Sequence, residues 1–359
     1  MSEQVIIAGK GIAGLVLSSQ LDKHGIDHVL LFRKEGQSPI SLGETIPPSA
    51  MPLLHNTGLF ELFEQTAYSK TSGYHSIWGS DLVIDHHFYQ ESPTAHGFKI
   101  NKAALIEQLT ELQQHRLQEV KSLKEVSLGA SVQVNAVTHQ GELEMSGRMM
   151  VDATGKKRAV LKLLNVPVKV RDQQIAFSTH LPGKYFEQLP YGVFMESFVC
   201  GWGIVSALDE ETNVMTLYTA AGQADHTLYR DFESWPQLLK NTKGLKYYLP
   251  DAQAGNPSKI IGYDASTVLA ERVAGQQWLA IGDAAMSFDP LSSHGITNAI
   301  WTANRAASLI KDAVQKNTAP DYNDYQRQIH ELFTGYAKVR TQLYQQKHEW
   351  EQSLLMRDC

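Results

Sequence analysis

The stretch Val5-Ile6-Ile7-Ala8-Gly9-Lys10-Gly11-Ile12-Ala13-Gly14 decides the fold of this chain. Its first four residues are apolar and predict a buried strand, residues 15–24 predict a helix, and residues 28–32 predict a second strand. A strand, a glycine-rich turn, a helix and a strand in this order are typical of a βαβ unit that binds a nucleotide. The N-terminal part of the chain is therefore predicted to be a Rossmann-type domain.

The glycines of this turn place a phosphate site at the start of the predicted helix. Gly9 and Gly11 permit a tight turn and a close approach of a pyrophosphate, and Gly14 permits the helix to pack closely on the strand. Ile12 and Ala13 lie in the turn that leads into this helix, whose N-terminus has free backbone N–H groups and the positive end of the helix dipole. We expect these five residues to bind the cofactor.

The end of the second predicted strand departs from the usual pattern. An acidic residue normally stands there and binds the ribose hydroxyls, but this chain has Phe32, and Glu35 follows three residues later. Because a phenyl ring accepts no hydroxyl hydrogen bond, we expect the adenosine end to be held less tightly. Arg33 is a candidate nucleotide contact, and a surface arginine is the alternative interpretation.

Two further motifs follow predicted strands. Gly282-Asp283-Ala284-Ala285 follows residues 277–281 and precedes a helix expected from Gly295 to about Val314. Val151-Asp152-Ala153-Thr154-Gly155 ends the second of two paired strands predicted at residues 131–137 and 142–151.

These motifs, together with Gly43-Glu44-Thr45-Ile46-Pro47-Pro48, resemble in type and order those of the aromatic hydroxylases and flavin-dependent halogenases. Trp78-Gly79-Ser80-Asp81 and Asp289-Pro290-Leu291-Ser292-Ser293-His294-Gly295-Ile296 resemble more narrowly the LodB/GoxB type. Flavoproteins of that type help to form the cysteine tryptophylquinone cofactor of partner amino-acid oxidases. The resemblance covers nearly the whole chain and implies FAD as the cofactor.

The resemblance also implies roles for individual residues. Asp283 would bind the ribityl chain, the loop with Pro290 would pass beside the flavin ring, and the helix that follows would point its N-terminus at the pyrimidine end. His294 is a candidate acid or base in this loop, and polar loop filler is its alternative. The full set of expected cofactor contacts is Gly9, Gly11, Ile12, Ala13, Gly14, Arg33, Lys102, Asp152, Gly155, Gly282, Asp283, Pro290, Gly295 and Ile296, with His294, Ser292 and Ser293 as the catalytic candidates.

The predicted fold class is α/β, with a β-sheet substrate domain inserted into the FAD-binding domain. Nucleotide-binding and helical signals lie at both ends of the chain, whereas short β-type segments dominate between them. We expect the FAD-binding domain to comprise residues 1–74, 100–159 and 271–321, the substrate domain 75–99 and 160–270, and C-terminal helices 322–359. The sheet domain should frame the open face of the flavin with Trp78, Tyr191, Phe194, Phe198 and Trp202.

Composition excludes several other classes. The net charge of −6, with no long basic run, gives no support for nucleic-acid binding. No apolar stretch is long enough to cross a membrane, and the start of the chain is not a signal peptide. Cys200 and Cys359 form no disulfide framework, which fits a cytoplasmic location. No metal site is expected, because Asp85-His86-His87 on a strand points to alternating faces.

The favoured function is that of an FAD-dependent monooxygenase or oxidase that uses molecular oxygen to modify a tryptophan on the precursor of a quinoprotein amino-acid oxidase. This substrate is implied by the resemblance alone. The alternatives are a hydroxylase of a small aromatic metabolite and a flavin-bearing assembly partner without turnover. Halogenation is disfavoured, because Ser292 stands where halogenases often have Glu, and because Lys70 lies in the right region but not in matching surroundings.

Overall fold

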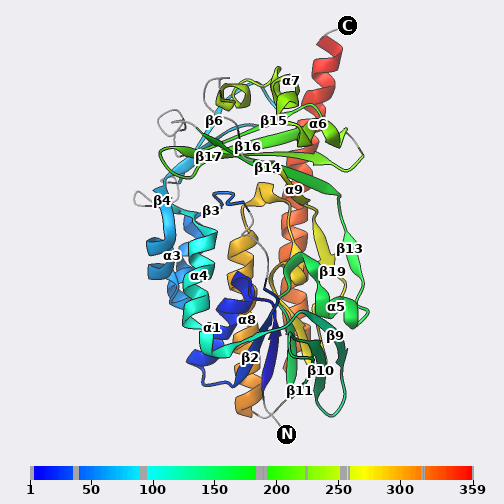
Figure 1. The fold of residues 1–359 in the computed structure, drawn as a ribbon. Coiled ribbons are helices and arrows are strands. Elements are labelled where there is room, and N and C mark those ends of the chain that lie inside the picture. The colour runs from blue at the N-terminus through cyan, green and yellow to red at the C-terminus, as the bar shows by residue number, and fades with distance from the viewer. Residues whose placement is uncertain are drawn as a thin grey trace.

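The computed structural model describes residues 4–34, 40–88, 95–182, 189, 192–222, 225–250, 257, 259–316, 318 and 320–357, with side chains to residue 350. Figure 1 shows two stacked parts, joined by the longest helix, which runs along both. The lower part carries the N-terminus and a mainly parallel sheet, and the upper part is a broad antiparallel sheet. The mixed α/β fold confirms the predicted fold class. Tyr191, Glu35 and Cys359 lie outside the described residues.

The six-stranded sheet of the lower part is built around the N-terminal strand. β1 pairs in parallel with β2 and β12, and β12 pairs in parallel with β21. Nearly every residue of these strands is buried, as expected for a sheet covered on both faces. In sheet order the strands are β20 (Ala274–Gly275), β21 (Trp278–Ala280), β12 (Met149–Asp152), β1 (Val5–Ala8), β2 (His28–Phe32) and β8 (Leu117–Glu119).

Helices pack on this sheet and on one another. α1 (Ile12–Lys23) packs against α8 (Gly295–Lys316), which brings the two glycine motifs of the sequence together. Residues 51–66 form two helices, because Gly58 adopts a left-handed conformation with φ of 67° and ends the first. The remaining helices of this part are α2 (Met51–Thr57), α3 (Phe60–Thr66), α4 (Lys102–Leu112) and α5 (Ala159–Leu163).

The strand predicted over residues 142–151 is also divided. β11 (Glu142–Gly147) belongs to an antiparallel sheet with β10 (Val132–Val137) and β9 (Ser122–Ser127), whereas β12 joins the parallel sheet. The break falls at Gly147, where a Cβ atom would lie 2.6 Å from the Gln4 carbonyl oxygen. The chain can therefore change sheets only with a glycine at this position.

The upper part is a seven-stranded sheet. One face is covered by α6 (His226–Arg230) and α7 (Trp235–Leu239), and the other face turns toward the lower part (Figure 1). The order is β18 (Ile261–Asp264), β14 (Gln174–Pro182), β17 (Thr212–Ala220), β16 (Gly201–Ala207), β15 (Val193–Phe198), β5 (Gly73–Ile77) and β6 (Ile84–His87).

Two small sheets connect the parts. One contains β3 (Thr45–Ile46), β7 (Gly97–Ile100) and β4 (Ala67–Thr71), and the other contains β13 (Val168–Val170), β19 (Val268–Ala270) and β22 (Met286–Ser287). We retain the sequence-based domain division as a proposal with two changes, since β5 begins at Gly73 and β7 pairs outside the large sheet. Short 3-10 helices cover Pro48–Ala50, Gln114–Arg116, Gly155–Lys157, Phe232–Ser234, Leu245–Tyr248, Gly282–Ala284 and Pro290–Ser292.

The C-terminal segment is one helix, α9 (Tyr322–Arg357), where several were expected. Near its start the Tyr325 hydroxyl donates to the Ala280 carbonyl oxygen of the parallel sheet, at 2.8 Å. Further along, the Leu343 carbonyl oxygen accepts from the Trp78 indole, also at 2.8 Å. α9 thus fixes the upper sheet relative to the lower part. No helix among the described residues is long and apolar enough to cross a membrane.

Candidate active site

The glycine turn after β1 leaves space for a ligand. An added Cβ at Gly11 would meet no atom within 4 Å, whereas one at Gly14 would lie 1.9 Å from the Gly9 carbonyl oxygen. Gly9 itself has φ of +116°. Gly14 and Gly9 are therefore needed for packing, and Gly11 opens onto the site. The first N–H groups of α1, which include those of Ile12 and Ala13, have no acceptor within the helix.

The second motif lies directly against the first. A Cβ at Gly282, which has φ of +56°, would lie 2.9 Å from the Ala13 Cβ atom. The Gly282 N–H donates to the Thr302 hydroxyl of α8 at 2.8 Å, which fixes the turn. Asp283 follows Gly282 in the same turn. Its side chain is half-buried and accepts no hydrogen bond from the described part of the chain. Its carboxylate is thus available to a ligand beside the phosphate site.

Three cations surround Asp283. Burial raises the pKa of its carboxyl, and the positive charges of Lys156, Lys102 and Arg158 oppose that rise. Lys156 also donates to the Asp264 carbonyl oxygen at 2.8 Å, and Arg158 donates to the Ser287 hydroxyl at 3.0 Å. The sequence pointed to Lys102 alone, although Lys156 and Arg158 directly follow the Asp-x-x-Gly motif. Positive charge here suits a cofactor that carries two phosphates and becomes negative on reduction.

Side chains of α9 fix the loop that precedes α8. Asp289 is fully buried, and its carboxylate accepts from the Leu291 N–H at 2.8 Å, the Tyr344 hydroxyl at 2.7 Å and the Arg340 guanidinium at 3.1 Å. Arg340 also forms an ion pair, at 3.0 Å, with Asp172, a residue that precedes β14. The loop that contains Pro290 is therefore rigidly placed.

Disrupting this hydrogen-bond and ion-pair network should lower the stability of the folded protein. We expect Arg340→Met to lower the free energy of unfolding by about 3 kcal/mol, because it leaves the Asp289 carboxylate buried without its cation. Adding Asp289→Asn should recover most of the loss. Urea unfolding of both single variants and the double variant measures the coupling. Arg327→Met is the control, since this exposed side chain of the same helix pairs with Glu331 at 2.9 Å and should change stability by less than about 1 kcal/mol. Equal losses from Arg340→Met and the control would contradict the expectation.

The catalytic candidates of this loop mainly bond to one another. The Ser292 hydroxyl donates to the Asp289 carbonyl oxygen at 3.1 Å, and the His294 ring donates through Nδ1 to the Ser292 carbonyl oxygen. Ser293 is exposed and left-handed, with φ of 52°. The exposed His294 ring keeps Nε2 for another contact, so a catalytic role for it stays a prediction.

The first turn of α8 offers unsatisfied polar groups. Gly295 has open space at its Cβ position, and Ile296 is buried. The Thr297 hydroxyl and the Asn298 side-chain amide are buried with no hydrogen-bond partner among the described residues. Buried polar groups rarely stay unpaired. These two therefore fit the polar edge of a bound FAD, together with the free N–H groups of the helix start.

Asp152 has a different role from the predicted one. Its buried carboxylate accepts from the Thr154 N–H and hydroxyl and from the N–H groups of Val160 and Leu161. These four hydrogen bonds hold the turn and the start of α5, so Asp152 has a structural role in this part of the site. Gly155, with φ of +62° and open space at its Cβ position, remains a candidate contact.

The adenosine end matches the sequence expectation in part. Phe32 ends β2, and the Lys10 ammonium lies 4.7 Å from the centre of its ring. Arg33 is exposed. A cation stacked on an aromatic ring thus occupies the place of the usual carboxylate.

The upper sheet contributes aromatic side chains, but not all those expected. Trp78 and Trp202 pack with Tyr218, and the Trp202 and Tyr218 rings are stacked at 3.9 Å. Phe194 and Phe198 point to the opposite face and belong to the core under α6 and α7, so their predicted place at the flavin is wrong. Alternate residues of a strand face opposite ways, and the sequence did not reveal which set faced inward.

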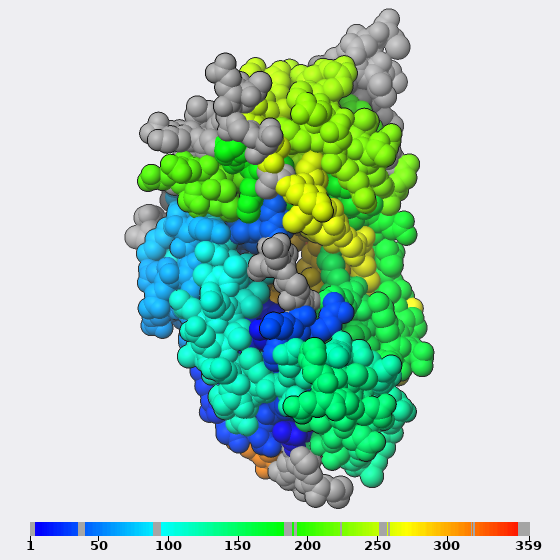
Figure 2. Space-filling model, in the orientation of Figure 1, coloured from blue at the N-terminus to red at the C-terminus, as the bar shows by residue number. Residues whose placement is uncertain are grey.

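Hydroxyl groups line the same inward face. Ser178 bonds to the Thr216 hydroxyl at 2.6 Å and to the Tyr263 hydroxyl at 3.1 Å. Leu291 of the loop that contains Pro290 packs against the aromatic cluster of this face. Figure 2 shows the surface hollowed between blue, green and yellow segments, with an orange segment visible at the base. A hollow therefore opens in the surface between the two parts of the molecule.

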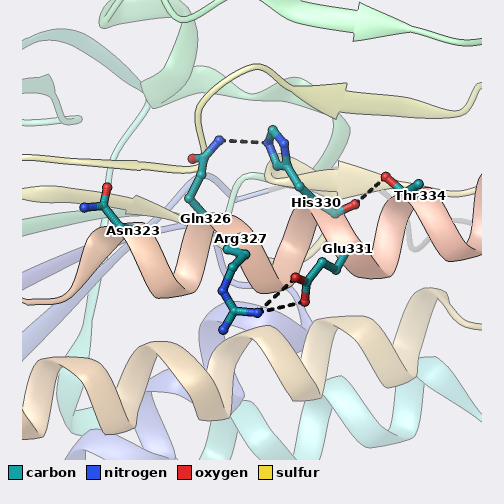
Figure 3. A pocket seen from close by; sticks show the side chains of 6 residues that line it. All are labelled: Asn323, Gln326, Arg327, His330, Glu331 and Thr334. Carbon is teal, nitrogen blue, oxygen red and sulfur yellow. Dashed lines mark hydrogen bonds and ion pairs between the residues drawn. The ribbon is translucent and has the colours of Figure 1, made fainter.

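A cavity on the surface of α9 does not form a candidate site. A shallow surface cavity of about 540 Å³ runs along α9, and Figure 3 shows its side chains paired with one another, such as Arg327 with Glu331. It is lined by Asn323, Gln326, Arg327, His330, Glu331 and Thr334. The described residues contain no cluster of three side chains able to hold a metal ion, and Asp85 bridges His75 and His87.

Comparison with known proteins decides the family. The sequence family described as "FAD binding domain" matches residues 2–326. This chain belongs to that family. The expected cofactor, FAD, is thereby confirmed, and the glycine turn, Asp283 and the start of α8 fit it. The chain is an FAD-dependent oxidoreductase.

Individual relatives agree with the narrower resemblance. The protein LodB of Marinomonas mediterranea, whose name describes an FAD-dependent oxidoreductase, is 26% identical over 98% of this chain and 95% of its own length. The solved structure of the peptidyl tryptophan dihydroxylase QhpG, essential for tryptophylquinone cofactor biogenesis, matches with a TM-score of 0.72 at 16% identity, over 97% of this chain and 76% of that one. The p-nitrophenol 4-monooxygenase PnpA of Pseudomonas putida matches with a TM-score of 0.79 at 14% identity, over 98% and 94%.

Proposed function

We propose that the chain is an FAD-dependent monooxygenase that hydroxylates a tryptophan side chain on the precursor of a partner quinoprotein amino-acid oxidase. The observation that carries the proposal is the hollow in the surface between the two parts of the molecule. The stacked Trp202 and Tyr218 rings, which are buried, make the inward face of the upper sheet aromatic, and this suits an indole substrate. An open cleft admits a side chain of a protein, whereas a free metabolite is usually enclosed. The likeness to LodB and QhpG supports a step in quinone cofactor biogenesis.

Bound FAD supplies the oxygen-transfer chemistry once it is reduced and meets molecular oxygen. The chain's own residues bind and orient. The Gly9–Gly14 turn and the start of α1 would hold the pyrophosphate, and Asp283 would bind the ribityl hydroxyls. Lys102, Lys156 and Arg158 place positive charge near Asp283. The Pro290 loop, fixed by Asp289, sets the wall on which the reacting ring lies.

The test uses the FAD-loaded protein, chemically reduced and then exposed to oxygen with the unmodified precursor. We expect the precursor to gain the mass of one or two oxygen atoms on a tryptophan, as read by peptide mass spectrometry. Free tryptophan and simple phenols should stay unchanged, and so should the precursor when a variant without bound FAD is used. Rapid hydroxylation of a free aromatic with an unchanged precursor would favour the metabolite hydroxylase.

Two further outcomes separate the alternatives. Stable complex formation with the precursor and no mass gain would favour an assembly partner without turnover. Bromide added to the same reaction should give no brominated product, because Ser292 replaces the glutamate expected of halogenases and Lys70 is an exposed residue paired with Glu64 at 2.6 Å. We retain the cytoplasm as the proposed location, on the basis of cysteine content.

A further inference from the structure

Glu44 has a backbone fixed on both sides. Gly43 before it has φ of +58°, and a Cβ there would lie 2.7 Å from the Ser206 hydroxyl of β16. That hydroxyl donates to the Gly43 carbonyl oxygen at 3.1 Å, and the Glu44 carbonyl oxygen accepts from the Ile100 N–H at 2.8 Å. The loop is thus bound to both the upper sheet and β7, so the position of the Glu44 side chain is set in advance.

The carboxylate of Glu44 is only half satisfied. One oxygen, Oε1, accepts from the Lys102 ammonium at 3.1 Å. The other, Oε2, is shielded from solvent and has no hydrogen-bond partner in the described parts of the chain. The side chain as a whole is 27% exposed, so part of it borders open space that a ligand can enter. A buried acceptor without a donor is costly, which marks a place that a ligand completes.

The groups around Glu44 place it between cofactor and substrate. Lys102, whose pKa is raised by Glu44, also interacts with Asp283 of the FAD motif. Tyr218 and Tyr263 lie on the other side, where burial raises the pKa of both hydroxyls and the negative charge of Glu44 adds to the rise. These hydroxyls already bond to each other and to Ser178. Glu44 therefore interacts with groups of both the FAD motif and the upper sheet, while its Oε2 lacks a donor among the described residues.

We propose that the Glu44 carboxylate accepts a hydrogen bond from the ring N–H of the substrate indole, an inference that rests on the proposed function. An indole N–H is a donor only, and the Glu44 carboxylate, which pairs with the Lys102 ammonium at 3.1 Å, offers it an acceptor. The same bond sets which edge of the ring faces the flavin. An aromatic ring without a donor leaves the oxygen unpaired and is bound more weakly.

The test is a thermodynamic cycle on the FAD-loaded protein. N-acetyltryptophanamide and its N1-methyl analogue, which lacks the ring donor, are titrated while the flavin absorbance is followed. In the wild type, N1-methylation should weaken binding roughly tenfold or more. In Glu44→Met this difference should vanish, because the acceptor is gone, and in Glu44→Gln it should be intermediate. Glu64→Gln is the control, since that exposed carboxylate pairs with Lys70 away from the cleft.

The outcomes are distinct. The same methylation penalty in the wild type and in both Glu44 variants overturns the proposal, as does a wild type that binds neither probe. A large loss of FAD affinity in Glu44→Gln with an unchanged penalty would assign the oxygen to the cofactor instead. Failure of the precursor to gain oxygen would reject the proposed function alone, because the cycle measures binding and needs no turnover.

Discussion

Gly11→Val is expected to abolish FAD binding while the free protein remains folded. The added side chain meets no protein atom near its Cβ position, so it occupies only the space needed by the pyrophosphate. We expect FAD affinity to fall by at least about 100-fold, or roughly 2.7 kcal/mol. Flavin content after gel filtration and fluorescence titration of the FAD-free protein measure the effect.

Gly14→Ala provides the contrast, since its Cβ would lie 1.9 Å from the Gly9 carbonyl oxygen. This variant should lower both FAD affinity and the melting temperature of the FAD-free protein, whereas Gly11→Val should lower only the affinity. Asp283→Ala should weaken FAD binding without removing a protein hydrogen bond. Flavin retained at the wild-type level in both Gly11→Val and Asp283→Ala would reject the site assignment.

Local sequence patterns predicted those turns, helices and strands whose formation depends mainly on residues close together in the sequence. The glycine turn, the following helix and the strand at Trp278–Ala280 were all expected, because buried strands and tight turns require particular residues at fixed spacing. Asn101 is a residue type favoured at a helix start, and its side chain accepts from the Ala104 N–H at 3.1 Å. Helix breaks at Gly58 and the change of sheet at Gly147 depend on contacts that a single segment does not reveal.

The site was predicted less completely than the fold. Asp152 stands in a recognised motif, yet its four hydrogen bonds, to Thr154 and the start of α5, become visible only in three dimensions. Phe194 and Phe198 were placed on the wrong face, since aromatic residues at strand spacing suit a core as well as a cleft. Glu44 was noted as part of a motif without a role, because its unpaired oxygen is defined by what surrounds it.

Lys99 is a further residue whose surroundings the sequence did not reveal. Its burial is expected to make the stability of the protein depend strongly on pH. Its side chain is 1% exposed and donates to the Gly192 carbonyl oxygen, to the Ser206 hydroxyl at 3.1 Å and to the Ala207 carbonyl oxygen at 2.9 Å. These acceptors are all neutral. Burial consequently lowers the pKa of Lys99 to about 7, compared with about 10.4 in an unfolded chain.

The direction of the pH effect follows from proton binding. Below pH 7 the folded and unfolded states both hold the proton, and the cost of burying the charge is present in full. Between about pH 7 and pH 10 the unfolded chain still binds the proton while the folded protein releases it, so stability rises with pH. The slope approaches about 1.4 kcal/mol per pH unit, and the whole span amounts to about 5 kcal/mol.

The measurement is urea unfolding of the wild type and Lys99→Met between pH 6 and pH 9. We expect the wild type to gain roughly 2 kcal/mol or more relative to Lys99→Met as the pH rises from 7 to 9, because methionine has no proton to release. The loss of three hydrogen bonds lowers the stability of the variant by a constant amount at every pH and leaves this slope unaffected. Lys70→Met is the matched control, since Lys70 is exposed beside Glu64 and its removal should give a nearly parallel profile. Parallel profiles for the wild type and Lys99→Met would mean that the buried ammonium keeps its proton throughout this range.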